Sequence, residues 1–120
     1  MPKRFRFPRS HRLTLTAEFR RVRTEGSSVR GETLTLAFWK ASEGPAQPRI
    51  GLVTSKRVGG AVARNKVRRH LREIFRKNQH KLTPGVWIVT IASNRSAASP
   101  FGALEDEWLR LARRASILAP

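Results

Sequence analysis

The feature that most constrains the fold is an amphipathic segment at residues 55–77, which is also the most basic part of the chain. Its apolar side chains recur at i, i+4, i+7 and i+8, the spacing of an α-helix that lies with one stripe on a core. We therefore predict a helix that opens after Gly59 and Gly60 and runs to about Gln79. The buried stripe consists of Val67, Leu71, Ile74 and Phe75.

The charges of this segment favour a surface that binds a polyanion over an ordinary solvated helix face. The segment carries nine of the 25 Lys and Arg residues and a single acid, Glu73. Acids at i,i+4 spacing would neutralise such a helix, and they are absent here. Arg outnumbers Lys, and a guanidinium can pair with two phosphate oxygens at once. The polar arc consists of Arg64, Asn65, Arg68, Arg69, Arg72 and Arg76, and Lys66 widens the basic surface.

Composition bounds the partners of the chain. With 120 residues, 39% of them hydrophobic, and a formal net charge of +17, the chain can form one domain with a modest core. The repulsion among its positive charges favours a phosphate-rich partner, which would neutralise them. No apolar run approaches the roughly 20 residues of a membrane-spanning helix, and no signal peptide is visible. Because Cys is absent, disulfides and Cys-based zinc sites are excluded. We expect a reducing, cytoplasmic location and no membrane partner.

The segments around the basic helix alternate between helix and strand patterns. Residues 13–25 favour a short helix, with Thr16 as its cap and Gly26 ending it in a left-handed conformation. Residues 33–39 alternate as a strand with one buried face, and residues 49–55 are predicted to run antiparallel to it. Residues 86–91 have the continuous apolar character of a central strand. The order predicts an α+β fold, a small α/β sandwich of order α-β-β-(β)-α-β-α with a central mixed sheet.

The two ends of the chain differ in character. Residues 1–12 are a basic arm, for which a disordered terminus and an RNA-contacting extension both stay open. The last helix is predicted to begin with Ser99 as cap and Pro100 at its first position. The acidic run 105–107 is interpreted as the complement of the helix dipole, so this helix is structural. We treat residues 1–120 as a single RNA-binding domain.

Autonomous catalysis is not expected. The chain has eight acids and three His, too few and too scattered to assemble metal-binding carboxylates or an acid–base pair. His70 and Glu73 stand at i,i+3, a spacing more often seen in a surface contact than in a catalytic site. The run 55–60 lacks the glycine and lysine spacing of a P-loop. We predict no catalytic and no metal-binding residues in the protein.

Three motifs make the chain resemble the protein subunit of bacterial ribonuclease P. They are the strand start Arg49-Ile50-Gly51-Leu52, the run Ser55-Lys56-Arg57, and above all Ala63-Arg64-Asn65-Lys66-Val67-Arg68-Arg69-His70-Leu71-Arg72-Glu73. The last is similar to the family's signature, an Arg-Asn-Arg run followed by further basic residues. The resemblance extends from about residue 12 to residue 118.

The resemblance implies a division of labour in tRNA processing. An RNA subunit carries the active site and uses Mg²⁺, bound mainly by RNA and substrate, to hydrolyse the phosphodiester that joins the 5′ leader to precursor tRNA. The protein binds this catalytic RNA and the leader, and no obligate protein partner is expected. The resemblance also implies a left-handed β-α-β crossover, contrary to the usual handedness. The implied RNA-binding residues are Lys56, Arg57, Arg64, Asn65, Lys66, Arg68, Arg69 and Arg72.

The implied leader cleft lies between the sheet and the first helix. Its candidate residues are Phe19, Arg23, Thr35, Ala37 and Trp39. Two aromatic positions of the family are replaced here, one by Arg23 and one by Ala37, and Trp39 is a candidate substitute that stacks on RNA. In the signature, Lys66 replaces the usual middle Arg, which keeps the charge but loses the bidentate fork.

Three other functions stay open on the residues alone. A ribosomal or general RNA-binding module would show no discrimination by leader length. A protein-only nuclease would cleave RNA without an RNA cofactor, and the sparse acids argue against it. A nonspecific DNA-binding protein would bind duplex DNA and precursor tRNA equally at matched salt.

Overall fold

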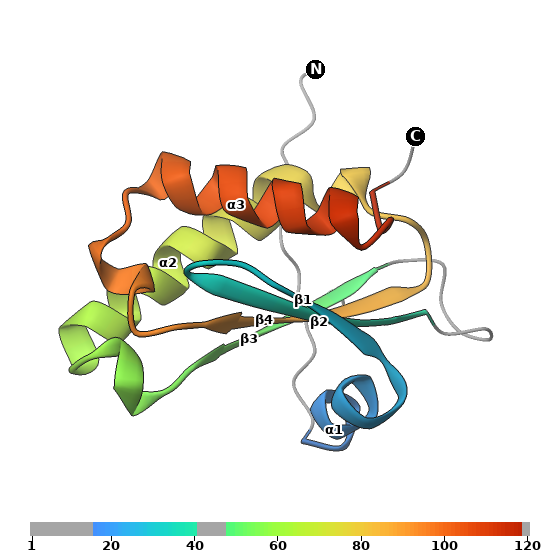
Figure 1. Ribbon diagram of the computed structural model, residues 1–120, viewed down its shortest axis with the longest axis horizontal. Coiled ribbons are helices and arrows are strands. Elements are labelled where there is room, and N and C mark those ends of the chain that lie inside the picture. The colour runs from blue at the N-terminus through green and yellow to red at the C-terminus, as the bar shows by residue number, and fades with distance from the viewer. Residues whose placement is uncertain (1–15, 41–47, 119–120) are drawn as a thin grey trace.

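The computed structural model describes residues 16–40 and 48–118, so the basic arm at residues 1–12 lies outside the described residues. Three helices and a four-stranded mixed sheet confirm the predicted α+β fold (Figure 1). Short 3₁₀ turns connect the elements. The elements are α1 (Thr16–Glu25), β1 (Ser27–Arg30), β2 (Leu34–Lys40), β3 (Arg49–Thr54), η2 (Lys56–Val58), α2 (Ala61–Asn78), η3 (Gln79–Lys81), β4 (Val86–Ala92), η4 (Ser96–Ala98) and α3 (Phe101–Arg114).

The sheet has the order β1-β2-β4-β3 and lies between two helical layers (Figure 1). Helices α2 and α3 cover one face, and α1 lies on the other. β3 and β4 are parallel neighbours, and α2 connects them as the crossover helix. β3 does run antiparallel to β2, as predicted, but β4 lies between them. β4 takes this inner place because its side chains are apolar or buried on both faces.

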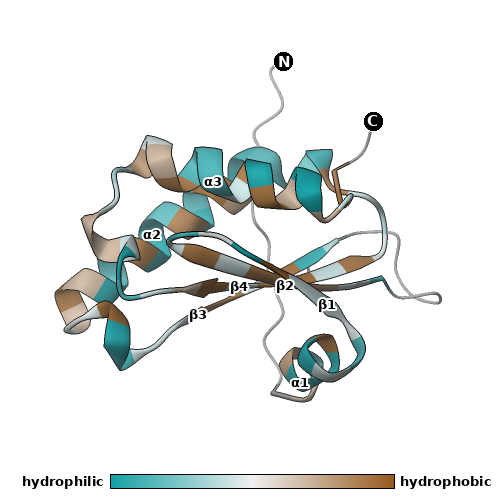
Figure 2. Ribbon diagram, in the orientation of Figure 1, coloured by the Kyte–Doolittle hydropathy of each residue, from teal (hydrophilic) through white to brown (hydrophobic). Residues whose placement is uncertain are grey.

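The main core lies between the sheet and the pair α2 and α3 (Figure 2). The predicted stripe of α2 is confirmed, since all four of its side chains are buried. Phe75 contacts Trp108 of α3, with ring centroids 5.8 Å apart. The indole N–H of Trp108 donates to Thr90 Oγ1 of β4 at 3.1 Å, so the one polar atom of this large side chain is satisfied inside the core.

A second, smaller core lies under α1. Val22 of α1 packs against Ala37 and Val89, and Phe19 lies at its margin. Ala37 faces α1, whereas Leu34 and Leu36 of the same strand face the main core. The predicted buried face of β2 is confirmed for Leu34 and Leu36, but the opposite face is also partly covered, since Ala37 is buried and Thr35 and Trp39 are half-buried.

The predicted helix ends at Gly26 and Ser99 are wrong in detail. Gly26 does not have a positive φ. It is required by close approach, since a Cβ there would lie 2.2 Å from the Phe38 carbonyl oxygen and 2.4 Å from that of Val22. Ser99 does not cap α3, because its hydroxyl donates to the Arg95 carbonyl at 3.3 Å, and Pro100 occupies the N-cap position.

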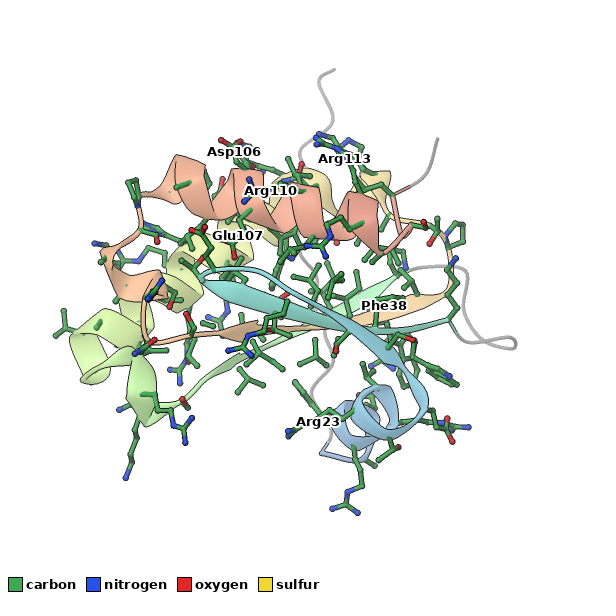
Figure 3. The ribbon with its side chains drawn as sticks, in the orientation of Figure 1. Arg23, Phe38, Asp106, Glu107, Arg110 and Arg113 are labelled. Carbon is green, nitrogen blue, oxygen red and sulfur yellow. The ribbon has the colours of Figure 1, made fainter. Side chains whose placement is uncertain are left out.

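Glu107 has a structural role that differs from the predicted complement to the helix dipole. It lies on the side of α3 that faces the sheet, whereas Asp106 lies on the outer side (Figure 3). Its carboxylate is buried and accepts the backbone N–H of Leu34 at 2.7 Å and of Thr33 at 3.0 Å. Glu107 therefore fixes α3 to the start of β2.

Candidate nucleic-acid interface

The first part of the interface is the polar arc of α2. Since the apolar stripe faces the sheet, the predicted polar arc lies on the outer side of the helix. We call six residues of this helix the basic face of α2: Arg64, Asn65, Lys66, Arg68, Arg69 and Arg72. Arg64 and Arg68 are half-buried, and the other four side chains are exposed. Arg76 of the predicted arc is left out of this set because it pairs with Glu73.

Arg68 is held in place by two partners. Its Nε donates to Thr54 Oγ1, at the end of β3, at 2.8 Å, and its Nη1 donates to Asn65 Oδ1 at 3.4 Å. These contacts orient the guanidinium without neutralising it, because neither partner is charged. Arg68 therefore keeps its full positive charge and further N–H groups for an anion.

An acid interrupts the positive charge at the carboxyl end of α2. Glu73 and Arg76 form an ion pair, with Arg76 Nε 3.0 Å and Nη2 2.5 Å from the carboxylate oxygens. The hydrogen bonds from Arg76 lower the pKa of Glu73. Within the described residues, no ion pair involves a member of the basic face of α2. The uncompensated charge is thus concentrated on the amino-terminal two-thirds of the helix.

His70 lies next to the basic face but not in it. Its ring and that of Phe101 form a T-shaped pair, with centroids 5.5 Å apart. Burial lowers the pKa of His70, and the nearby charges of Lys66 and Arg69 lower it further. Glu73 binds Arg76 instead of His70, so the described contacts contain no acid–base pair at this spacing.

Lys56 and Arg57 lie on η2, the turn between β3 and α2, and both are exposed. Ser55 caps the turn, and its Oγ accepts the Arg57 N–H at 3.3 Å. Gly59 ends the turn with φ 140°, a backbone conformation that L side chains rarely adopt. The turn therefore places both cations close in sequence to the start of the basic face.

The second part of the interface is the α1 cleft, two adjoining depressions between α1 and the sheet. The first, the apolar compartment, has a volume of about 410 Å³. The second, the hydroxyl compartment, has a volume of about 300 Å³ and is partly lined by Ser27 and Ser28. Arg23 and Ile91 line both, so the two compartments are contiguous. The remaining lining residues are Phe19, Leu52, Val53 and Val89 in the first compartment, and Val22, Gly26, Thr35 and Ala37 in the second.

The structure brings four of the five predicted cleft residues to this surface: Phe19, Arg23, Thr35 and Ala37. Trp39 does not line either compartment. Its ring and that of Trp87 form a T-shaped pair, with centroids 5.3 Å apart, and the Arg21 guanidinium lies 4.8 Å from the centroid of the Trp39 ring. Trp39 therefore packs beside the cleft, against Trp87 of β4 and Arg21 of α1.

Sequence reasoning missed the part of the cleft contributed by β3 and β4. Val53 and Ile91 are Cα partners on neighbouring strands and line the apolar compartment. Val53 is 37% exposed, which is unusual for a large apolar side chain in this fold. The alternation of residues 49–55 was the available signal, since it places Val53 on the face opposite Ile50.

The cleft and the basic face meet at the end of β3. Val53 lines the cleft, and the next residue, Thr54, accepts the hydrogen bond from Arg68. Val53 and Thr54 point to opposite faces of the sheet, and β3 is an edge strand, so one extended ligand can contact both parts by passing round this edge.

No group of three or more His, Asp or Glu residues in ranges 16–40 and 48–118 could hold a metal ion. None of the helices in the same ranges is long and apolar enough to cross a membrane.

Comparison with known proteins gives consistent matches. A family model described as Ribonuclease P matches residues 7–116. The ribonuclease P protein component of Chloroflexus aurantiacus is 40% identical over 111 residues, covering 92% of this chain and 81% of that protein. The one from Methylococcus capsulatus is 40% identical over 114 residues, covering 92% and 88%.

Solved structures are also similar. The RNase P protein from Thermotoga maritima has a TM-score of 0.76 at 31% identity, covering 86% of this chain and 96% of that chain. The RNase P protein from Staphylococcus aureus has a TM-score of 0.82 at 24% identity, covering 90% and 97%, a likeness that concerns the fold alone.

Proposed function

The chain belongs to the ribonuclease P protein family, and from this premise we propose that it binds the catalytic RNA through the basic face of α2 and the 5′ leader of precursor tRNA in the α1 cleft. As a ribonuclease P protein component it takes part in tRNA processing, as a partner of the ribonuclease P RNA within an endoribonuclease. The RNA subunit carries the active site, and Mg²⁺ is held mainly by that RNA and the substrate.

The observation that carries the proposal is that the two surfaces differ in chemistry: one is basic and the other is largely apolar. The basic face presents cations without acid partners among the described residues, which suits the phosphates of a structured RNA. The apolar compartment of the α1 cleft is open and lined by an aromatic ring, which suits the splayed bases of a single strand. A 5′ leader is a single-stranded part of a precursor tRNA.

The first experiment is cleavage of precursor tRNA by the cognate catalytic RNA at low Mg²⁺, with and without the protein, using long and trimmed leaders. We expect strong stimulation that falls when the leader is shortened. Absence of stimulation, with tight binding to ribosomal RNA instead, would favour a general RNA-binding module. Cleavage by the protein alone, after nuclease treatment to remove RNA, would overturn both functions.

A pair of matched variants on α1 separates leader binding from general charge. Arg23 and Arg20 are both exposed on this helix, but only Arg23 lines the cleft. We expect Arg23→Gln to reduce the advantage of long leaders over trimmed ones, and Arg20→Gln to preserve it. Equal effects of the two variants would remove the leader from the α1 cleft.

A further inference from the structure

The two compartments of the α1 cleft have different chemistry, and this difference predicts how a strand lies in them. In the apolar compartment the Phe19 ring lies with the aliphatic side chains of Val53, Val89 and Ile91, whereas Leu52, which also borders it, packs its side chain on the main core. An aromatic ring and aliphatic walls hold the face of a nucleobase by stacking, whatever the base.

The hydroxyl compartment can instead hydrogen-bond to the edge of a base. Ser28 is the Cα partner of Ala37 in the pairing of β1 with β2, and Thr35 stands two residues before Ala37. Because alternate strand residues share a face, the side chains of all three point toward the α1 side of the sheet. Ala37 is small and buried, so it leaves space between the two hydroxyls.

These two hydroxyl groups are available to a ligand. Within the described part of the chain, neither the Ser28 nor the Thr35 hydroxyl forms a hydrogen bond with another residue. A hydroxyl both donates and accepts, so a pair of them can satisfy the mixed donors and acceptors of a base edge.

Arg23 lies between the compartments and lines both of them. Its side chain is exposed and projects from α1 beneath the sheet (Figure 3). In the described ranges it forms no ion pair. A cation between two base-sized depressions is placed to bind the phosphate that joins two nucleotides.

We propose that the α1 cleft holds two successive leader nucleotides: one base stacks in the apolar compartment, the neighbouring base hydrogen-bonds with Thr35 and Ser28, and Arg23 binds the phosphate between them. This inference rests on the proposed function, since it assumes that the leader enters the cleft. It adds a division of labour in which one nucleotide is held without regard to identity and the adjacent one is read.

The test measures binding of precursor tRNA to the reconstituted holoenzyme, with leaders that carry one abasic nucleotide at each position in turn. Thr35→Val keeps the shape of the side chain and removes its hydroxyl. We expect it to weaken binding about threefold to tenfold, the value of a neutral hydrogen bond, and to have no effect when one particular position is abasic.

A second variant locates the stacked base. Phe19→Leu keeps an apolar side chain in the small core but removes the ring, and we expect at least about a fivefold loss of affinity. That loss should disappear for an abasic nucleotide adjacent to the position coupled to Thr35. The control is Thr24→Val, since Thr24 is exposed on α1, bonds to the Arg20 carbonyl at 2.9 Å and lines neither compartment.

Each outcome decides the matter. Coupling of Thr35 and Phe19 to two adjacent positions supports the proposal. Coupling of both to the same position, or of Thr35 to none while long leaders still bind better, overturns it and leaves leader binding intact. If the unmodified holoenzyme binds precursor tRNA equally well with long and trimmed leaders, the inference and the proposed function are overturned together.

Discussion

Replacing Glu107 by Ala should destabilise the fold far more than an ordinary surface change on α3. The carboxylate accepts two backbone N–H groups from the start of β2, at 2.7 Å from Leu34 and 3.0 Å from Thr33. It lies 73 and 74 positions away from these donors in sequence. The contact is therefore one of the few polar links between the carboxyl-terminal helix and the sheet.

The loss of unfolding free energy can be estimated from the two backbone N–H groups that the substitution leaves without a partner. Leu34 is buried, so its N–H would lose its partner without access to water, at a cost of about 1–3 kcal/mol. The N–H of Thr33 is part-buried, and water can replace some of its bond, so it adds about 1 kcal/mol. The expected loss is about 2–4 kcal/mol, a large share of the roughly 5–15 kcal/mol that stabilises a typical domain.

The assay is equilibrium unfolding in urea, followed by circular dichroism. A loss of this size lowers the midpoint by about 1–2 M, given a slope of about 2 kcal/mol per M for a small domain. Asp106→Ala is the matched control, because Asp106 is the neighbouring acid and is exposed; it should change stability by less than about 0.5 kcal/mol. Equal midpoints for the two variants would refute the assigned role of Glu107.

Three further predictions concern the basic helix and the end of α1. Arg68→Ala should lower the slope of log affinity against log salt for RNA by about one unit, whereas Arg113→Ala, on the outer side of α3 (Figure 3), should leave it unchanged; equal slopes for both would remove Arg68 from the phosphate contacts. The pKa of His70 in the folded protein lies below its ordinary value of 6.5, so the unfolded chain binds the proton first and stability should fall as the pH drops below 6.5. His70→Gln should flatten this part of the curve of unfolding free energy against pH, and an unchanged curve would contradict the assignment. Gly26→Ala should cost about 1–3 kcal/mol in thermal unfolding, because its Cβ would lie 2.2 Å from a backbone oxygen, and a loss below about 0.5 kcal/mol would refute that clash.

The parts of the fold that could be predicted from sequence are those with a strong local period. The stripe of α2 repeats over two turns and more, so Leu71 and Phe75 could be placed inside before any partner was known. The same holds for the apolar run of β4. Both patterns depend on neighbours in sequence, which is why the predictions made from them are confirmed by the structure.

The parts that could not be predicted depend on distant partners. Nothing local to Glu107 shows that its carboxylate meets two backbone groups on β2, so its acidic neighbours favoured a dipole role. Similarly, the sequences of β2 and β3 give no sign that β4 lies between the two strands. Strand alternation gives the face of the sheet on which Trp39 lies, but not whether α1 leaves it inside the cleft. That depends on how the helix packs on the sheet.

The place of β4 also determines when the protein can fold during its synthesis. β4 lies between β2 and β3, although it follows both in the chain. Chains fold from the amino terminus as the ribosome releases them, and a two-stranded hairpin such as β1 with β2 is marginal alone. Until Ala92 has emerged, β3 has no neighbouring strand in the described sheet. The basic helix and the cleft should therefore appear in one late cooperative step, and a nascent chain that stops before residue 92 should offer its cations only as an unstructured polyelectrolyte.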